Sequence, residues 1–230
     1  MESPHPNTTA HPDIPRNHLG LPVVSQPALY AQLVRHNPDH QIVDVRPLLP
    51  TAHYEVVYAT ERNFLGRQVY PEPELFLRRP AALGLVRAAE RLSAQGCGLR
   101  LFDGYRPYAV TVLFYEELQD PNFAADPRKG SKHNRGMAID LALYDLRTGH
   151  PLPMPSAYDE ISERASHAYE GGDAQARHHR DLLRETMRQA GFSALRHEWW
   201  HYDFAGWERC PIYDLSHREI REANAGRGGP

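Results

Sequence analysis

Two short stretches of the sequence together offer the side chains that a hydrolytic metal site needs. Residues 131–140 read SKHNRGMAID and supply an imidazole, His133, and a carboxylate, Asp140, seven positions later. The stretch EWWH supplies a second imidazole, His201, three residues after another carboxylate, Glu198. Two histidines and one acid form a three-ligand shell that leaves the fourth position of a tetrahedral zinc ion open. Glu198 then remains available as a carrier of protons.

Whether these side chains meet depends on the backbone between them. His133 and Asp140 are an odd number of positions apart, so on a straight strand they point to opposite faces. Gly136 lies between them and can supply a bend, because glycine tolerates backbone angles that are closed to other residues. Glu198 and His201 converge if their segment turns locally and diverge if it is flat. The spacing leaves both possibilities open.

The neighbours of the two acids separate them from ordinary polar residues. Asp140 stands between Ile139 and Leu141, and an apolar strand rarely buries a carboxylate that has no partner. Glu198 lies beside two tryptophans, where an ionised carboxylate is costly. A single histidine in a chain with 14 of them is, by contrast, usually solvated or hydrogen-bonded. We assign that ordinary role to His53, His150 and His167, and a solvated helix face to His178 and His179.

Helical and strand patterns alternate along the chain and predict an α+β domain with an antiparallel or mixed sheet. Strands are indicated at residues 41–46, 99–102, 137–144 and 192–204. Helical spacing covers residues 80–95, 107–119 and 174–190. In the first of these helices, the spacing predicts a buried face of Leu83, Val86, Ala89 and Leu92.

Length and composition indicate a single domain with a tail at each end. We expect a mobile arm over residues 1–25, the domain over 26–217 and a polar tail over 218–230. The formal net charge is −3 and neither sign forms a long block, so we expect no nucleic-acid partner. The chain has neither a signal-like start nor a long apolar run, so we expect no membrane partner and a cytoplasmic location. Cys97 and Cys210 are expected to be reduced thiols.

Four sequence blocks carry a family resemblance. They are YATERNFLG at 58–66, DGYRP at 103–107, the pattern S-x-H-x-x-G-x-A-x-D at 131–140, and EWWH at 198–201. With these blocks the chain resembles the D-alanyl-D-alanine dipeptidases, zinc enzymes of the D,D-peptidase group that share their fold with the hedgehog signalling domain. A weaker block, MPSAYD at 154–159, departs from the family's M-G-T-x-F-D at Pro155, Ser156 and Tyr158.

The resemblance implies a fold of the hedgehog/D,D-peptidase kind and hydrolysis of a small dipeptide, D-Ala-D-Ala, to two D-alanines. It implies one zinc ion per chain, held by His133, Asp140 and His201, with Glu198 as the general base. Arg106 is the candidate that stabilises the oxyanion formed on attack. The remaining residues that the resemblance assigns to orienting Arg106 or to holding the substrate are Ser131, Tyr58, Tyr70, Asp103 and Asp159.

Two other functions fit parts of the same pattern. One is a zinc D,D-carboxypeptidase or endopeptidase that acts on peptidoglycan stem peptides, which needs an open groove rather than a closed pocket. The other is a zinc-bearing binding module without turnover, which needs neither Glu198 nor Arg106 and is therefore disfavoured. The ion itself is left open, although two nitrogens and one oxygen suit zinc.

Overall fold

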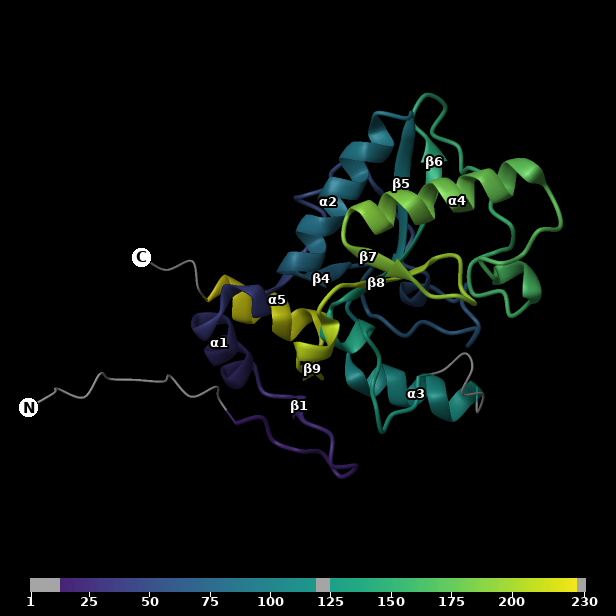
Figure 1. The fold of residues 1–230 in the computed structure, drawn as a ribbon. Coiled ribbons are helices and arrows are strands. Elements are labelled where there is room, and N and C mark those ends of the chain that lie inside the picture. Colours follow the sequence, from purple (N-terminus) through teal and green to yellow (C-terminus); the bar gives the residue numbers. More distant parts are fainter. Residues whose placement is uncertain (1–12, 119–124, 227–230) are drawn as a thin grey trace, which may run out of the picture.

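A mixed sheet of five strands forms the centre of the molecule (Figure 1). The computed structural model describes residues 13–118 and 125–226. The strands lie in the order β3, β5, β6, β8, β7, with β3 parallel to β5 and the other neighbours antiparallel. Their bounds are His53–Tyr54 (β3), Cys97–Asp103 (β5), Ala138–Asp145 (β6), Phe192–Ala194 (β7) and His201–Phe204 (β8). This sheet and its helices confirm the predicted α+β class.

Two helices, α2 (Arg79–Ser93) and α4 (Ala174–Gln189), pack against the sheet and against each other (Figure 1). The predicted face of α2 is wrong at Leu83, which is 44% exposed, whereas Leu92 is buried and Val86 and Ala89 are half-buried. The helix instead buries a face of small and medium side chains. Because Gly84 has no Cβ, the helix approaches the sheet closely: an added Cβ would lie only 2.6 Å from the ring of Phe204. The buried residues of α2 are Ala81, Ala82, Gly84, Leu85, Ala88 and Leu92.

Elements from both ends of the chain form a second layer beside the sheet. Helix α1 (Pro27–His36) packs against α5 (His217–Ala225), and β1 (Val23–Val24) pairs in parallel with β9 (Ile212–Tyr213). Residues 13–25 and 218–225 are therefore structured parts of the domain, which corrects the predicted arm and tail. Val24 and Ile220 are fully buried there. The rest of the predicted arm and tail lies outside the described residues.

The remaining elements support the loops around the sheet. Strands β2 (Ile42–Asp44) and β4 (Phe76–Arg78) form an antiparallel pair, and α3 (Tyr108–Leu118) begins directly after the DGYRP turn. Residue 119, the predicted end of that helix, lies outside the described residues. Short 3-10 helices span Pro38–His40, Val57–Ala59, His133–Arg135 (η3), Glu163–Ala165 and Trp207–Arg209. The predicted strand 192–204 is two strands, β7 and β8, joined by a turn.

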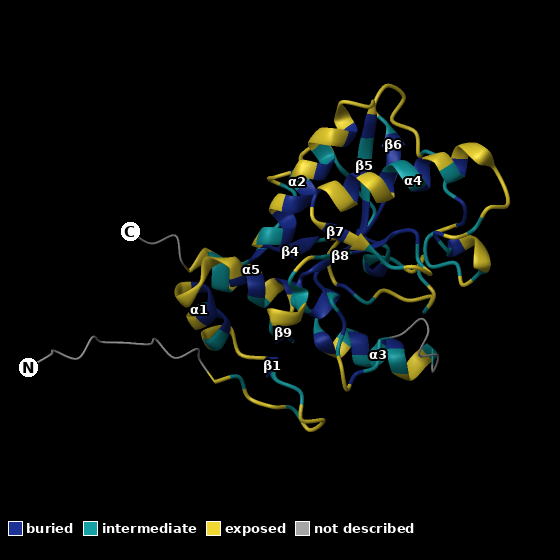
Figure 2. Cartoon of the chain, in the orientation of Figure 1, coloured by how far each residue is buried: buried dark blue, intermediate teal, exposed yellow. Residues whose placement is uncertain are grey.

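Burial is greatest along the middle strands, as Figure 2 shows in dark blue. Residues 138–144 of β6 are all buried, Asp140 among them. Cys97 and Cys210 are free cysteines. Within the described residues, no helix combines the length and the hydropathy that crossing a bilayer requires.

Candidate active site

The register of three neighbouring strands brings acidic and imidazole side chains together. Asp140 on β6 is paired with His201 on β8, and on its other side with Asp103 at the end of β5. Directly opposed residues of antiparallel strands have closely spaced Cβ atoms. Asp140 and His201 are therefore placed side by side by backbone hydrogen bonding alone, although they are distant in sequence.

His133 reaches the same point from a loop. It opens the 3-10 helix η3, and Gly136 ends this helix in the left-handed conformation with φ of 63°. A Cβ at Gly136 would lie 2.6 Å from the Ile42 side chain and 2.8 Å from the backbone nitrogen of Arg78, so no other residue fits there without a shift. The bend that the sequence predicted at Gly136 is confirmed. It turns the chain so that His133 faces Asp140.

The three side chains converge on one point. His133 Nε2 lies 3.1 Å from His201 Nδ1, and Asp140 Oδ1 lies 3.0 Å from His201 Nδ1 and 3.4 Å from His133 Nε2. With zinc–ligand bonds of about 2.0–2.1 Å, the edges of a ligand tetrahedron measure roughly 3.3 Å. The donor triangle of this chain therefore fits a zinc-sized ion. Within the described part of the chain, no other group of three such residues meets this spacing.

Hydrogen bonds on the outer side of each imidazole fix which nitrogen faces the triangle. His133 Nδ1 donates to the Gly104 carbonyl at 2.7 Å, which leaves Nε2 as the acceptor nitrogen. His201 Nε2 lies 2.8 Å from Asp203 Oδ1, and Asp203 in turn lies 3.0 Å from Lys132 Nζ. Outer partners of this kind set the tautomer and the ring orientation of metal-binding histidines. Both rings therefore present a lone pair to the same point.

Electrostatics in this cluster favour positive charge at the point of convergence. Burial lowers the pKa of His201, but its hydrogen bonds to Asp140 and Asp203 outweigh burial and raise that pKa to about 10. Burial also acts to raise the pKa of Asp140, but His133 and His201 outweigh it and hold that pKa well below the usual range. The group stays a carboxylate, and the site is built to receive a proton or a cation.

Glu198 stands beside this cluster on the turn between β7 and β8. Its Oε2 lies 3.8 Å from His201 Nδ1, so the local turn brings the two residues together, one of the two possibilities left open by the sequence. Burial, ahead of the charge of Asp140, raises the pKa of Glu198. The raised pKa brings this carboxyl closer to neutral pH, which suits a group that accepts and returns a proton.

Arg106 is held in place by a rigid support. Its Nε and one terminal nitrogen donate to Asp103 Oδ2 at 2.9 and 2.6 Å. Asp103 Oδ1 accepts from the Tyr70 hydroxyl at 3.0 Å. The guanidinium also lies 4.7 Å from the Phe114 ring centroid. One face of the planar group is thus packed, and its direction is fixed.

A cavity of about 530 Å³ connects these groups. Tyr58, Arg106, Ser131, Asp159 and Glu198 line it together with the three convergent residues. Tyr70 and Asp103 do not line it; they lie behind Arg106, where they support it. The apolar part of the wall comes from Phe64, Phe114, Leu118, Ile161, Leu195, Trp200 and Trp207.

Tyr58 and Asp159 form a polar pair in this wall. The Tyr58 hydroxyl donates to Asp159 Oδ2 at 2.8 Å. Burial, and then the charge of Asp140, raises the pKa of Asp159 to about 8. Asp159 has φ of 59°, and no other non-glycine residue in the described part of the chain has a positive φ. Such strain persists where the surroundings fix it and is common at functional sites.

Comparison with known proteins gives the relationship directly. A family model described as D-ala-D-ala dipeptidase matches residues 39–221. The chain belongs to this family. The D-alanyl-D-alanine dipeptidase of Escherichia coli is 33% identical over 164 residues, which cover 71% of this chain and 84% of the relative. The enzyme of the same name from Enterococcus faecium is 36% identical over 169 residues, which cover 65% and 84%. A solved structure of the LdcB LD-carboxypeptidase aligns over 92% of this chain and 94% of its own, at 17% identity and a TM-score of 0.45.

Membership in the D-Ala-D-Ala dipeptidase family confirms the resemblance that the four sequence blocks carried. It makes the chain a metallopeptidase, and the relatives' names support hydrolysis of D-Ala-D-Ala. The match spans all four blocks, from residue 58 to residue 201.

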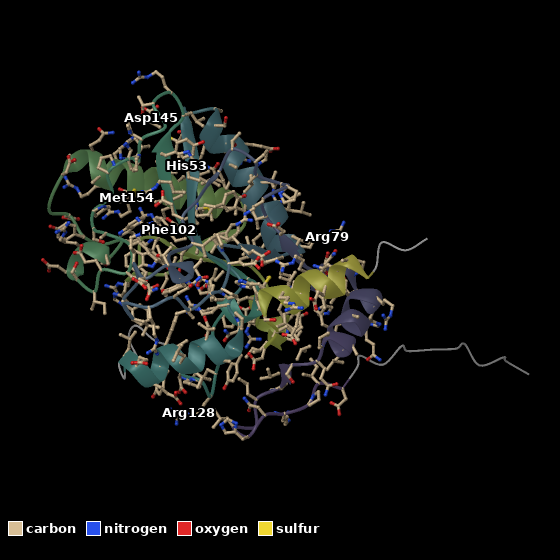
Figure 3. The ribbon with its side chains drawn as sticks, turned by 180° about the vertical axis from the view of Figure 1, so that it is seen from behind. His53, Arg79, Phe102, Arg128, Asp145 and Met154 are labelled. Atoms are coloured by element: carbon tan, nitrogen blue, oxygen red, sulfur yellow. The ribbon has the colours of Figure 1, made fainter. Side chains whose placement is uncertain are left out.

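Sequence reasoning missed several residues that support this dipeptidase-family site. Tyr158 donates from its hydroxyl to Asp140 Oδ2 at 2.9 Å, and its ring packs against Phe102, which Figure 3 labels near the centre of the molecule. Asp203 could have been predicted from the sequence, because it lies two positions after His201 and therefore on the same face of the strand. Tyr158 and Lys132 come from loops, and no periodicity marks them.

Among the other histidines, the assignments of His179 and His167 are wrong. His179 belongs to no solvated face: it is buried, and its Nδ1 donates to the Pro153 carbonyl at 2.9 Å. His53, labelled in Figure 3, stacks on Tyr144 with ring centroids 3.8 Å apart. His167 is buried, yet neither ring nitrogen has a hydrogen-bond partner among the described residues.

Proposed function

We propose that this chain hydrolyses free D-alanyl-D-alanine to two D-alanine molecules with one zinc ion held by His133, Asp140 and His201. The observation that carries the proposal is the triangle of donor atoms, with edges of 3.0 to 3.4 Å, beside the Glu198 carboxylate. Two imidazoles and one carboxylate are a ligand set that suits zinc. A bound zinc ion supplies Lewis acidity, which acidifies water and polarises a carbonyl oxygen.

Glu198 is the proton carrier in this proposal. Its buried carboxylate takes a proton from the attacking water at Oε2 and returns it to the nitrogen of the departing D-alanine. Glu198 Oε2 lies 3.8 Å from His201 Nδ1, so it is beside the three proposed ligands but is not a fourth ligand. Glu198 acts as base and then as acid, so it ends the cycle unchanged.

Arg106 stabilises the oxyanion that forms when water adds to the peptide carbonyl. Two N–H groups point to Asp103, and the rest of the guanidinium faces the cavity. A fixed donor saves reorganisation during the reaction, and loss of one such donor typically raises the barrier by about 3 kcal/mol. Asp103 and Tyr70 act here as positioning residues that hold Arg106.

The substrate's charged ends need partners inside the cavity. We assign the ammonium to Asp159 and Tyr58, whose side chains are hydrogen-bonded to each other at 2.8 Å. We assign the free carboxylate to Ser131, on the loop that leads to His133. A site that binds both charged ends selects a free dipeptide over a longer peptide. We also propose that the protein acts in the cytoplasm.

The test compares substrates on the purified full chain, together with its metal content. We expect about one zinc per chain, hydrolysis of free D-Ala-D-Ala, and roughly hundredfold slower cleavage of the N-acetylated dipeptide, which leaves the ammonium partners unpaired. Comparable rates on the capped dipeptide or on a longer peptide ending in D-Ala-D-Ala would instead identify a carboxypeptidase. Absence of hydrolysis with zinc bound would identify a binding module.

A further inference from the structure

A second cavity, of about 810 Å³, lies on the other side of the loop that carries His133. The 3-10 helix η3 separates the two cavities: His133 lines the first, and Arg135 lines the second. The proposed peptidase reaction uses none of the side chains in the second cavity. Its polar lining consists of Asn37, Asp39, His40, Arg78, Arg135, Glu208 and Arg209.

Arg78 is the most unusual of these residues. It is only 1% exposed, yet none of its hydrogen-bond partners among the described residues is a carboxylate. Its guanidinium donates to the Arg135 carbonyl at 2.9 Å and to the Pro211 carbonyl at 3.4 Å. It also lies 2.8 Å from His40 Nδ1 and stacks over the Tyr213 ring. Neutral partners satisfy part of its hydrogen bonding, but they bring no negative charge. Buried guanidinium groups are normally paired with an anion.

Two further arginines line the same cavity. Arg135 is half-buried and directs one guanidinium nitrogen to the Cys210 carbonyl, and Arg209 is exposed at the edge. Neither forms an ion pair with any residue that the structure describes. The acids in the lining, Asp39 and Glu208, are both exposed and lie beyond ion-pairing distance of all three arginines. Three guanidinium groups thus face two acids, an excess of one positive charge.

We propose that this cavity is a binding site for a small oxyanion of the phosphate type. Guanidinium groups bind phosphate oxygens through paired N–H donors, and a phosphate group would bring the negative charge that the neutral partners of Arg78 lack. Beside the arginines, the wall is apolar, with Ile14, Leu21, Leu33, Met137, Phe204 and Ile212. This wall has room for an apolar group attached to the phosphate. The anion is therefore either free phosphate or a phosphate monoester.

Inorganic phosphate and phenyl phosphate are the two probes, titrated into the full-length chain by calorimetry. Metal is first removed by chelation so that the anion has no ion to bind in the first cavity, and chloride holds the ionic strength constant. We expect saturable binding of at least one probe. Tighter binding of phenyl phosphate would identify an esterified ligand, and equal binding would identify free phosphate.

Four variants locate the binding. Arg135→Gln removes one charged donor, which should lower the affinity at least tenfold, since such hydrogen bonds contribute about 1.5 kcal/mol or more. Arg209→Gln, at the exposed edge of the cavity, should lower the affinity about twofold. Because Arg209 makes no contact in the core, this substitution should not affect folding. Arg79→Gln is the matched control, an exposed arginine next to Arg78 that lies outside the lining and is labelled in Figure 3. Lys129→Gln reports binding in the first cavity, which Lys129 lines.

The proposal holds if Arg135→Gln and Arg209→Gln weaken binding while Arg79→Gln and Lys129→Gln leave it unchanged. It fails if neither probe binds more tightly than chloride. It fails equally if Lys129→Gln abolishes the binding and Arg209→Gln does not, because the anion then occupies the first cavity. Should Arg135→Gln fail to fold, the contrast between Arg209→Gln and Arg79→Gln decides.

Discussion

Asp140 and His201 face each other across β6 and β8, and Asp140 Oδ1 lies 3.0 Å from His201 Nδ1. Sheet register thus supplies two of the three proposed ligands before any loop is placed. The third, His133, depends on the left-handed turn at Gly136. The site therefore has a rigid part on the sheet and a part set by one glycine.

The first prediction concerns metal binding by His201. His201→Ala removes one corner of the donor triangle, so we expect loss of bound zinc and of D-Ala-D-Ala hydrolysis together. Metal content by atomic absorption and a D-alanine release assay measure the two. His178→Ala, at an exposed histidine on α4, is the control and should keep both. Full metal content in His201→Ala would exclude this ligand set.

The second prediction separates proton transfer from metal binding. Glu198→Gln keeps the shape of the side chain but loses the base, so we expect kcat to fall by about 10²- to 10⁴-fold while zinc stays bound. Glu163→Gln, at an exposed glutamate, should match the wild type. A Glu198→Gln enzyme with near-normal kcat would require another base.

The third prediction concerns the outer partner of His201. Asp203→Asn weakens the contact that orients the ring, 2.8 Å from His201 Nε2, so we expect zinc affinity to fall about 10- to 100-fold. Competition with a chelator measures the affinity without reference to turnover. Lys132→Met removes only the partner of Asp203 and should have a smaller effect. Equal effects of the two substitutions would argue against ring orientation as the cause.

The proposed ligands could be predicted from sequence because each lies in a short motif with a distinctive neighbour. Asp140 sits in an apolar strand, and Gly136 marks the bend before it. The positions of α2, α3, α4, β2, β5 and β6 also followed from local periodicity, whereas α1 and α5 were not predicted. Asp203 needed one more step, the two-residue repeat of a strand, since it shares the face of His201.

Features that depend on distant contacts could not be predicted in the same way. The buried face of α2 is made of small residues such as Gly84, and hydrophobic spacing favours large ones. Strand β1 has two residues and exists only because β9 pairs with it. The resemblance assigned Tyr70 to holding the substrate, yet its hydroxyl donates to Asp103. No local pattern records any of these contacts.

The fourth prediction concerns the stability of the fold in acid. Burial, ahead of the charge of Arg184, lowers the pKa of His167 to about 4, from an ordinary value of 6.5. Between pH 6.5 and pH 4 the histidine of the unfolded chain binds a proton while the buried ring of the folded chain stays neutral. The free energy of unfolding therefore has its full His167 contribution above pH 6.5 and loses it as the pH falls towards 4. Between pH 6.5 and pH 5 the loss amounts to roughly 2 kcal/mol.

Urea unfolding at pH 7 and pH 5 tests this sign. His167→Phe keeps a ring beside Tyr202 but cannot be protonated, so the free energy of unfolding should fall less between the two pH values than in the wild type. His178→Ala, at an exposed position, should show the wild-type difference. If His167→Phe and wild type lose the same free energy, another group causes the acid sensitivity.

The fifth prediction concerns recognition of the free ammonium. Asp159→Asn removes the carboxyl group that would ionise beside the substrate ammonium, and a hydrogen bond to a charged group contributes about 1.5–3 kcal/mol. KM for D-Ala-D-Ala should therefore rise about 10- to 100-fold, with a smaller change in kcat. Tyr58→Phe keeps the carboxylate and removes only its 2.8 Å hydrogen bond, so its effect on KM should be smaller. The N-acetylated dipeptide is the control substrate. Because it has no ammonium, the rate of its slow hydrolysis should be the same in Asp159→Asn as in the wild type. An equal loss on both substrates would show that Asp159 maintains the cavity instead of reading the charge.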